Sequence, residues 1–305
     1  MKIDKKNGNV NYNDENHIYW DENGNYISVT TLIGKYENEY DKDFWSSYKA
    51  LQELLTPEEF KIEKKYLLQT KKVDLQYFLD TYSINETNFN LIKQNILDKW
   101  QHENKASCDR GTRIHAELEK MYTNKKETDL KKFGLGGKFS INTNESLEYS
   151  NLKLLDIDKG VFPEFLIYSV SNDGILKVAG QIDLLIKDGN DIIIYDYKTN
   201  KKIDETSYFD FNTKKNQMMK YPLNNLMDCN KMHYTMQLST YAWMLQKINP
   251  DFKIKYLGII HYDHNNNVTE YEIPYLKKDV ERMLKDYKKK LIIKQREDSR
   301  KPIVF

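Results

Sequence analysis

Cysteine is scarce in this sequence, which has only Cys108 and Cys229 among 305 residues. Two thiols are too few for a disulfide framework, a four-cysteine zinc site or a cysteine-ligated iron–sulfur cluster, and they fit a reducing compartment. The N-terminal segment is polar, and no apolar run approaches the roughly 18 residues that are needed to cross a bilayer. We therefore expect a cytoplasmic protein with no membrane partner.

Net charge is also nearly absent, because 47 basic residues face 46 acidic ones. The balance gives no argument for a polyanionic partner, so any nucleic-acid site must be local. The length of 305 residues and the 39% hydrophobic content suit one large or two small globular domains with a sizeable core.

The first half of the sequence combines a hairpin with a long helical region. Asn23-Gly24 lies between two β-type runs within 17–34 and predicts a tight turn, after which Ser28 to Thr31 offer hydroxyls to cap a helix near Leu32. Residues 42–124 are expected to be helical, with a capping box that starts at Thr56 and amphipathic segments at 58–69, 74–82 and 87–103. This region is predicted to form a helical subdomain.

The second half alternates strands with helices. Residues 125–150 form an exposed connection that could include a short hairpin, and strand-like runs follow at 162–170, 175–188 and 191–199. A helix is expected at 232–248, two strands at 254–262 and 268–273, and a charged terminal helix at 277–295. The fold class is α/β of the mixed α+β type, with a central mixed β-sheet flanked by helices.

Two carboxylates and a lysine approach one another in the segment 180–198. Asp183 lies on one predicted strand, and Asp196 and Lys198 lie on the next, where residues two apart face the same side. Oxygen ligands of this kind suit Mg²⁺ or Mn²⁺. An Asp-x-Lys alone indicates an ordinary surface ion pair, but the apolar run before Asp196 predicts a buried strand, where unpaired charge is costly.

Further polar residues lie on neighbouring predicted elements. Glu164 begins a strand amid apolar residues, and His115 borders the apolar stripe of a helix, with Glu119 one turn later. Gln237 and Tyr241 share a face of the helix after the strands, one turn apart. Each residue taken alone is more simply explained as a surface or structural side chain. They indicate a functional site only when they are considered together.

The order of these residues resembles the RecB-like branch of the PD-(D/E)XK nuclease superfamily. That branch has a helix histidine, a glutamate, Gly-x-x-Asp, Asp-x-Lys and Gln-x-x-x-Tyr. Here the same order reads His115, Glu164, Gly180 to Asp183, Asp196 to Lys198, and Gln237 to Tyr241. Ser28-Val29-Thr30 is similar to the entry segment of phage and mitochondrial genome-maintenance exonucleases in this branch.

The resemblance implies a restriction-endonuclease-like core with an N-terminal helical insertion, and roles for individual residues. The implied metal ligands for one or two Mg²⁺ or Mn²⁺ ions are His115, Asp183, Asp196 and the Tyr197 carbonyl. Glu164 would assist through a second metal or water, and Lys198 would act on the nucleophile, so the catalytic set is Glu164, Asp183, Asp196 and Lys198. Expected substrate contacts are Gln237, Tyr241, Ser28, Thr30, Arg113 and Thr199. No iron–sulfur cluster is expected.

The boundaries that follow are a single nuclease domain over 1–305, with a hairpin and entry at 1–34, a helical subdomain at 35–106 and the catalytic core at 107–305. Segment 200–232 interleaves aromatic and basic residues, a composition that suits base stacking and phosphate neutralisation, although an ordinary mobile loop is an equal alternative. The residues concerned are Tyr208, Phe209, Phe211, Tyr221, Lys201, Lys202, Lys214, Lys215 and Lys220, of which Tyr208, Phe209, Lys214 and Lys215 are assigned to substrate binding.

The predicted function is metal-dependent hydrolysis of DNA, with an exonuclease acting on single strands or free ends as the first hypothesis. A structure-selective endonuclease and a catalytically silent nucleic-acid-binding or assembly protein are the alternatives. The resemblance also makes plausible a phage-type role in DNA recombination, replication or repair, with replication or recombination proteins as partners and the host cytoplasm as location.

Overall fold

The computed structural model describes residues 3, 5–123, 125–143, 153–210 and 213–299. The chain divides into two compact units, where the sequence suggested one domain with a helical subdomain at 35–106. The first unit comprises Met1–Glu37, Gly111–Phe209 and Lys215–Phe305, and the second comprises Asn38–Arg110 and Asp210–Lys214. The chain crosses between them after Glu37, within α5 (Glu86–Thr123), within β10 (Phe209–Asp210) and before β11 (Lys215–Asn216).

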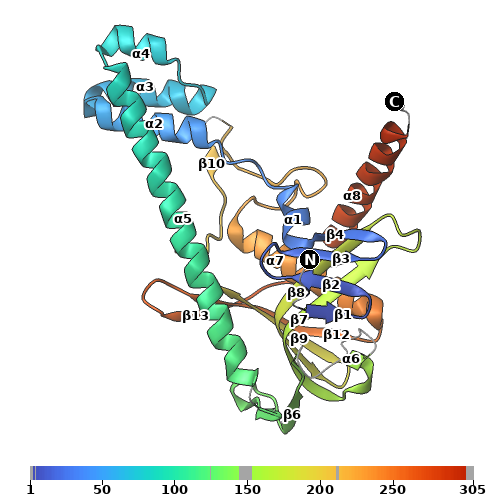
Figure 1. The fold of residues 1–305 in the computed structure, drawn as a ribbon. Coiled ribbons are helices and arrows are strands. Elements are labelled where there is room, and N and C mark those ends of the chain that lie inside the picture. The colour runs from blue at the N-terminus through green and yellow to red at the C-terminus, as the bar shows by residue number, and fades with distance from the viewer. Residues whose placement is uncertain (1–2, 4, 124, 144–152, 211–212, 300–305) are drawn as a thin grey trace. The chain divides into compact units, whose positions relative to one another are not determined.

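The first unit is built on an 11-stranded mixed sheet (Figure 1). Its strands are β1 (Lys5–Asn7), β2 (Val10–Asn13), β3 (Ile18–Asp21), β4 (Gly24–Ser28), β5 (Glu127–Asp129), β6 (Lys138–Ile141), β7 (Lys159–Val170), β8 (Lys177–Asp188), β9 (Asp191–Lys198), β12 (Lys253–Tyr262) and β13 (Val268–Glu272). β1 to β4 form an antiparallel meander, and β4 joins β8 in parallel. β8 also pairs antiparallel with β7 and β9, and β9 pairs in parallel with β12.

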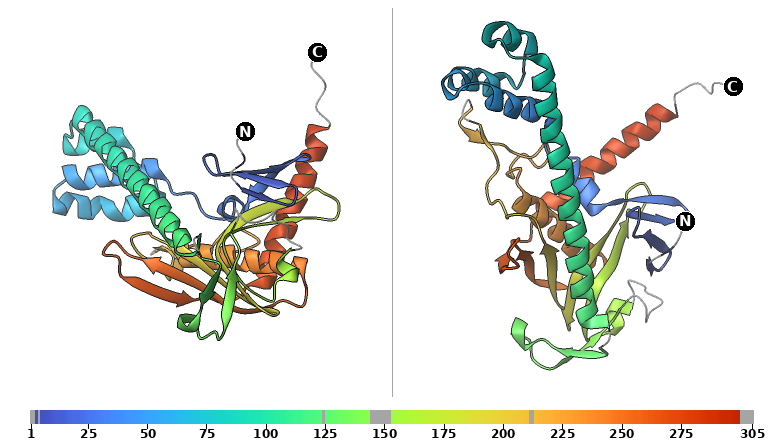
Figure 2. Two further views of the ribbon diagram at one scale, coloured as in Figure 1. Left: turned by 60° about the horizontal axis from the view of Figure 1, so that its bottom comes forward. Right: turned by 60° about the vertical axis from the view of Figure 1, so that its left-hand side comes forward.

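Helices cover both faces of the central strands. α7 (Asn230–Ile248) lies against β7, β8, β9 and β12, and α1 (Val29–Gly34) and α8 (Lys277–Asp298) pack on α7 (Figure 2). On the other face, Leu118 and Tyr122 of α5 join a second apolar cluster with β8 and β9. The predicted mixed sheet flanked by helices is therefore confirmed. Short elements α6 (Lys153–Asp156) and a 3₁₀ turn (Lys131–Phe133) complete this unit within the described residues.

Local signals explain several elements of the first unit. The hairpin predicted at Asn23-Gly24 joins β3 to β4, and a turn at Gly189-Asn190 joins β8 to β9. The Ser28 hydroxyl accepts a hydrogen bond from the Thr31 amide and caps α1, which begins at Val29 rather than near Leu32. The hairpin suggested within 125–150 is present as β5 and β6, while residues 144–150 lie outside the described part of the chain.

The second unit is helical, with α2 (Lys42–Leu54), α3 (Pro57–Thr70), α4 (Leu75–Tyr82) and the first part of α5. Thr56 and Glu59 form the predicted capping box at the start of α3. The predicted helix at 87–103 and the His115 helix are one continuous helix of 38 residues, α5, because no glycine turn or proline interrupts 104–110. Apolar side chains of all four helices form a core of their own.

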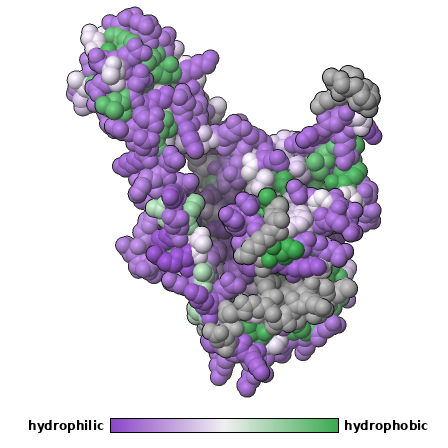
Figure 3. Space-filling view, in the orientation of Figure 1, coloured by the Kyte–Doolittle hydropathy of each residue, from purple (hydrophilic) through white to green (hydrophobic). Residues whose placement is uncertain are grey.

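The face drawn in Figure 3 is mostly hydrophilic. Within the described residues, no helix combines the length and the apolar character that are needed to span a membrane.

Candidate active site

The alternation of side chains along β7 and β8 is interrupted at Glu164 and Asp183. Pro163 pairs with Leu184 and Phe165 pairs with Ile182, so the two carboxylate residues lie opposite each other between these pairs. Ile182 packs in the cluster under α7, whereas Leu184 packs in the cluster with the end of α5. Because residues two apart on a regular strand share a face, the chain changes face at Asp183.

On β7, the side chains change from one face of the sheet to the other at Glu164. Its φ of +51° lies in the left-handed region, which is uncommon for a residue other than glycine and costs of order 1–3 kcal/mol. The side chain is 11% exposed, and its Oε2 accepts a hydrogen bond from Gln181 and lies 3.7 Å from the Lys5 Nζ. Contacts to two strands thus hold this carboxylate in a strained backbone conformation.

Burial raises the pKa of Glu164 well above its usual range, and the nearby Asp183 charge adds to this effect while Lys5 opposes it. Protonation of one carboxyl relieves the repulsion between them, and a cation between the two relieves it while both stay ionised. This arrangement favours binding of a positive ion.

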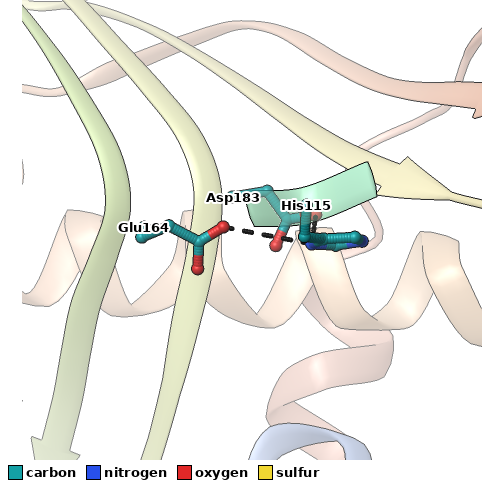
Figure 4. A group of neighbouring side chains, drawn as sticks. All are labelled: His115, Glu164 and Asp183. Atoms are coloured by element: carbon teal, nitrogen blue, oxygen red, sulfur yellow. Dashed lines mark ion pairs between the residues drawn. The ribbon is translucent and has the colours of Figure 1, made fainter. Parts of the chain in front are cut away.

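His115, Glu164 and Asp183 form a group that fits a divalent cation (Figure 4). The His115 Nδ1 lies 3.6 Å from Asp183 Oδ2 and 3.9 Å from Glu164 Oε1. Two ligands of an ion held at about 2.1 Å are at most about 4.2 Å apart, so both separations are compatible with one shared ion. All three ligand atoms lie within 4.8 Å of one another, which leaves only a small adjustment for the third pair.

The other nitrogen of His115 fixes the orientation of the ring. Nε2 lies 3.0 Å from the Tyr197 carbonyl oxygen, which can only accept, so this nitrogen carries the proton and Nδ1 keeps its lone pair for a metal. α5 approaches β9 closely at Gly111, where a Cβ would lie 3.2 Å from the Thr199 hydroxyl, a tight contact. One helical turn and two strand residues span similar lengths, so Gly111 aligns with Thr199 and His115 with Tyr197.

Asp196 and Lys198 point to the same side of β9, as their spacing predicts. The Lys198 Nζ lies 2.5 Å from Asp196 Oδ2 and 4.6 Å from the centre of the Tyr234 ring on α7. Burial disfavours the Lys198 ammonium, but Asp196 and Asp183 outweigh it and raise the pKa of the lysine. Burial raises the pKa of Asp196 to about 6, against the lowering effect of Lys198.

Gln237 and Tyr241 connect α7 to this ion pair. The Gln237 amide donates to Asp196 Oδ1 at 3.0 Å and lies 3.3 Å from the Tyr241 hydroxyl. Tyr241 is only 3% exposed and packs against Gly180, where an added Cβ would lie 2.5 Å from ring atom Cε1. The glycine of Gly-x-x-Asp and the tyrosine of Gln-x-x-x-Tyr therefore form one contact.

A family model of the PD-(D/E)XK nuclease superfamily matches residues 79–301. The chain belongs to the PD-(D/E)XK nuclease superfamily. Nucleases of this superfamily generally use divalent metal ions and act on DNA, and the buried His115, Glu164 and Asp183 group is one that could bind such an ion.

No curated protein shows a significant match to the chain. Among solved structures, the crystal structure of SSO0001 shows 19% identity and a TM-score of 0.27 over 44% of this chain and 50% of that one. The match thus spans half the length of that protein.

The structure brings the residues of the superfamily motifs together in two adjoining groups. His115, Glu164 and Asp183 form the candidate cation site, and Asp183 Oδ2 also accepts a hydrogen bond from the Tyr197 amide at 2.7 Å. Asp196, which the resemblance placed among the metal ligands, lies outside that group of three and instead pairs with Lys198 and Gln237.

The other expected substrate residues lie away from these contacts or at their border. Ser28 caps α1, Thr199 borders Gly111, and Thr30 and Arg113 are exposed. Tyr208 and Phe209 are 41% and 42% exposed, and Lys214 and Lys215 are exposed. Tyr221 is 74% exposed, and Lys201, Lys202 and Lys220 are exposed as well. Phe211 lies outside the described residues.

Lys5, Gln181 and Tyr234 also lie beside the site, although the sequence did not predict a role for them. Gln181 lies inside the Gly-x-x-Asp motif, and Tyr234 is three residues before Gln237 on the same helix, so both had a positional signal. Lys5 had none, because its proximity to Glu164 depends on how the N-terminal meander packs. The buried Asn7 fixes that packing through a 2.6 Å hydrogen bond to the Leu166 carbonyl.

Proposed function

We propose that this chain is a Mg²⁺- or Mn²⁺-dependent deoxyribonuclease of the RecB-like branch that lacks an iron–sulfur cluster. The observation that carries the proposal is the group of His115, Glu164 and Asp183 at an interrupted position of two buried strands. Two cysteines in the whole sequence cannot supply four thiolate ligands. The contact between Gly180 and Tyr241 supports the branch, because it links two of its motifs.

A divalent ion at this group would neutralise charge on the scissile phosphate and lower the pKa of water. The chain's own residues supply the rest. Lys198 places an ammonium beside the carboxylates, where it orients the attacking water and stabilises the charge that develops on the phosphate. Gln237 holds Asp196, and through it the lysine, in position. Attack of the water oxygen on phosphorus forms one P–O bond and breaks the bond to the 3′ oxygen, which takes up a proton from solvent.

The proposed substrate is DNA that is single-stranded or has free ends, and exonuclease action is the preferred mode. Tyr208, Phe209 and Tyr221 are exposed aromatic side chains in a segment that is rich in lysine. Aromatic faces stack on unpaired bases, and lysines neutralise phosphates, so this composition favours single strands. A role in DNA recombination, replication or repair, as in phages, is part of the same proposal.

The test is cleavage of end-labelled linear and circular single-stranded DNA with Mg²⁺, Mn²⁺ or EDTA. We expect metal-dependent degradation of the linear strand, an intact circle, and a rate for Asp183→Asn that is lower by about a thousandfold, or about 4 kcal/mol of barrier. Asp188→Asn is the matched control on β8, because Asp188 pairs with Lys159 away from the site. It is expected to cleave at the wild-type rate.

Each other outcome points to a different function. Cleavage of the circle would replace the exonuclease with an endonuclease of the same fold. Tight DNA binding without turnover in either metal would identify a silent binding protein and reject the enzyme.

Lys5 is expected to position Glu164 for this reaction. Lys5 and Gln181 both engage Oε2, which leaves Oε1 directed at His115. We expect Lys5→Ala to lower kcat about tenfold with little change in KM for DNA, since about 1.4 kcal/mol of positioning energy is lost. Lys5→Arg should restore most of the rate, as measured in steady-state cleavage assays.

Lys6 provides the control, because it is the next residue on β1 and is exposed. Lys6→Ala should match the wild type. An increase in activity of Lys5→Ala at low metal concentration would show instead that Lys5 competes with the cation.

A further inference from the structure

Three aromatic side chains of the second unit form a cluster that reaches the surface. Tyr40 precedes α2, Trp45 lies in its first turn, and Trp100 lies on α5. The rings of Tyr40 and Trp45 are nearly parallel, with an angle of 8° and centroids 6.4 Å apart. Trp100 meets Tyr40 at 66° and 6.0 Å. Tyr40 is nevertheless 58% exposed. Its ring is therefore accessible to solvent while it contacts the indole rings of Trp45 and Trp100.

The cluster is anchored in the core of its unit. Trp45 makes edge contacts with Phe44 at 5.0 Å and Tyr48 at 5.5 Å, and both of these side chains are buried. An aromatic surface that is fixed before binding loses little side-chain entropy when a ligand stacks on it. The exposed ring is therefore presented in a defined orientation.

Three lysines lie next to the cluster and can neutralise phosphate. The Lys71 Nζ lies 4.4 Å from the centre of the Trp45 ring. Lys42 and Lys49 lie three residues before and four after Trp45, on the same side of α2, and both are exposed.

Three exposed carboxylates, Glu39, Asp41 and Asp43, flank Tyr40, and the last two have partners. Asp43 pairs with Lys93 at 2.6 Å, and Asp41 accepts a hydrogen bond from the Phe44 amide at 2.8 Å.

We infer that Tyr40, with Trp45 and Trp100, is a stacking platform for an unpaired base of single-stranded DNA. An unpaired base has a free π face, whereas the bases of a duplex are already stacked on their neighbours. Lysines spaced along α2 would neutralise the flanking phosphates. The inference rests on the proposed nuclease function and adds a second DNA contact, on a unit that holds none of the candidate catalytic residues.

The test measures binding without cleavage, by the fluorescence anisotropy of a labelled oligo-dT in EDTA with the full-length protein. Tyr40→Ala is expected to weaken binding about tenfold, whereas Tyr40→Phe keeps the ring and should bind as the wild type does. Binding should also quench tryptophan fluorescence in the wild type. Affinity for a blunt duplex should be the same in all three proteins.

Tyr66→Ala is the matched control, since Tyr66 is 54% exposed on α3 of the same unit. It should bind oligo-dT as the wild type does. Unchanged binding by Tyr40→Ala, or an equal loss for oligo-dT and duplex, would overturn the platform. A chain that binds oligo-dT through Tyr40 but never cleaves it would reject the nuclease function and keep the platform.

Discussion

Replacing Lys198 with methionine is expected to lower the rate of metal-dependent DNA cleavage by at least about a thousandfold, equivalent to about 4 kcal/mol of barrier. Lys198 is the one cation that the structure places against Asp196 in the described part of the chain, and no neutral side chain can replace its charge beside a phosphate. Initial rates with a labelled single strand and Mn²⁺ measure the effect.

The same substitution is expected to lower the free energy of unfolding by about 3 kcal/mol. The Asp196 side chain is 2% exposed, and removal of its partner leaves a buried carboxylate without a cation. The partial exposure of Lys198, at 18%, keeps the cost near the lower end of the range for buried pairs. Urea denaturation measures this quantity separately from activity.

A double variant separates the two effects. Asp196→Asn with Lys198→Met removes both charges, and the new amide oxygen still accepts the hydrogen bond from Gln237. Stability should return to within about 1 kcal/mol of the wild type while activity stays lost. Lys255→Met is the control, because its pair with Asp191 is half exposed and worth little. Cleavage by Lys198→Met within tenfold of the wild-type rate would remove Lys198 from the reaction.

The elements that the sequence predicted well depend on local chemistry. Asn23-Gly24 supplies the turn conformation for its hairpin, and Thr56 caps its helix wherever the rest of the chain lies. Pairing between distant strands has no such signal. Ile27 pairs with Val178 in parallel, and neither segment contains a local sequence signal that predicts this pairing.

The same distinction between local signals and long-range packing applies to the candidate site. The shared face of Asp196 and Lys198 follows from the period of a strand, so spacing alone predicted their pairing. The left-handed φ of Glu164 follows from packing, because a glutamate has no local preference for it. The resemblance implied that Asp196 would bind a metal together with His115, and the structure places Glu164 with His115 and Asp183 and places Asp196 against Lys198.

Gly180→Ala is expected to lower the free energy of unfolding by about 2 kcal/mol and to reduce cleavage strongly, although it adds one methyl group. The new Cβ would lie 2.5 Å from Cε1 and 3.0 Å from the hydroxyl oxygen of Tyr241. Tyr241 is buried in the cluster under α7 and cannot move without repacking it, which is the situation in which overpacking is costly. A displaced Tyr241 would also move Gln237 and, through it, Asp196.

A double-mutant cycle with Tyr241→Ala tests whether this contact is the cause. Tyr241→Ala alone should cost about 3–5 kcal/mol through the cavity that it leaves, and adding Gly180→Ala should then cost nothing further, since its methyl group enters that space. Gly34→Ala is the control, because a Cβ there meets nothing within 4 Å. In the helix it should leave stability unchanged or raise it slightly. Additive losses in the cycle would show that Gly180 is required for a reason other than its contact with Tyr241.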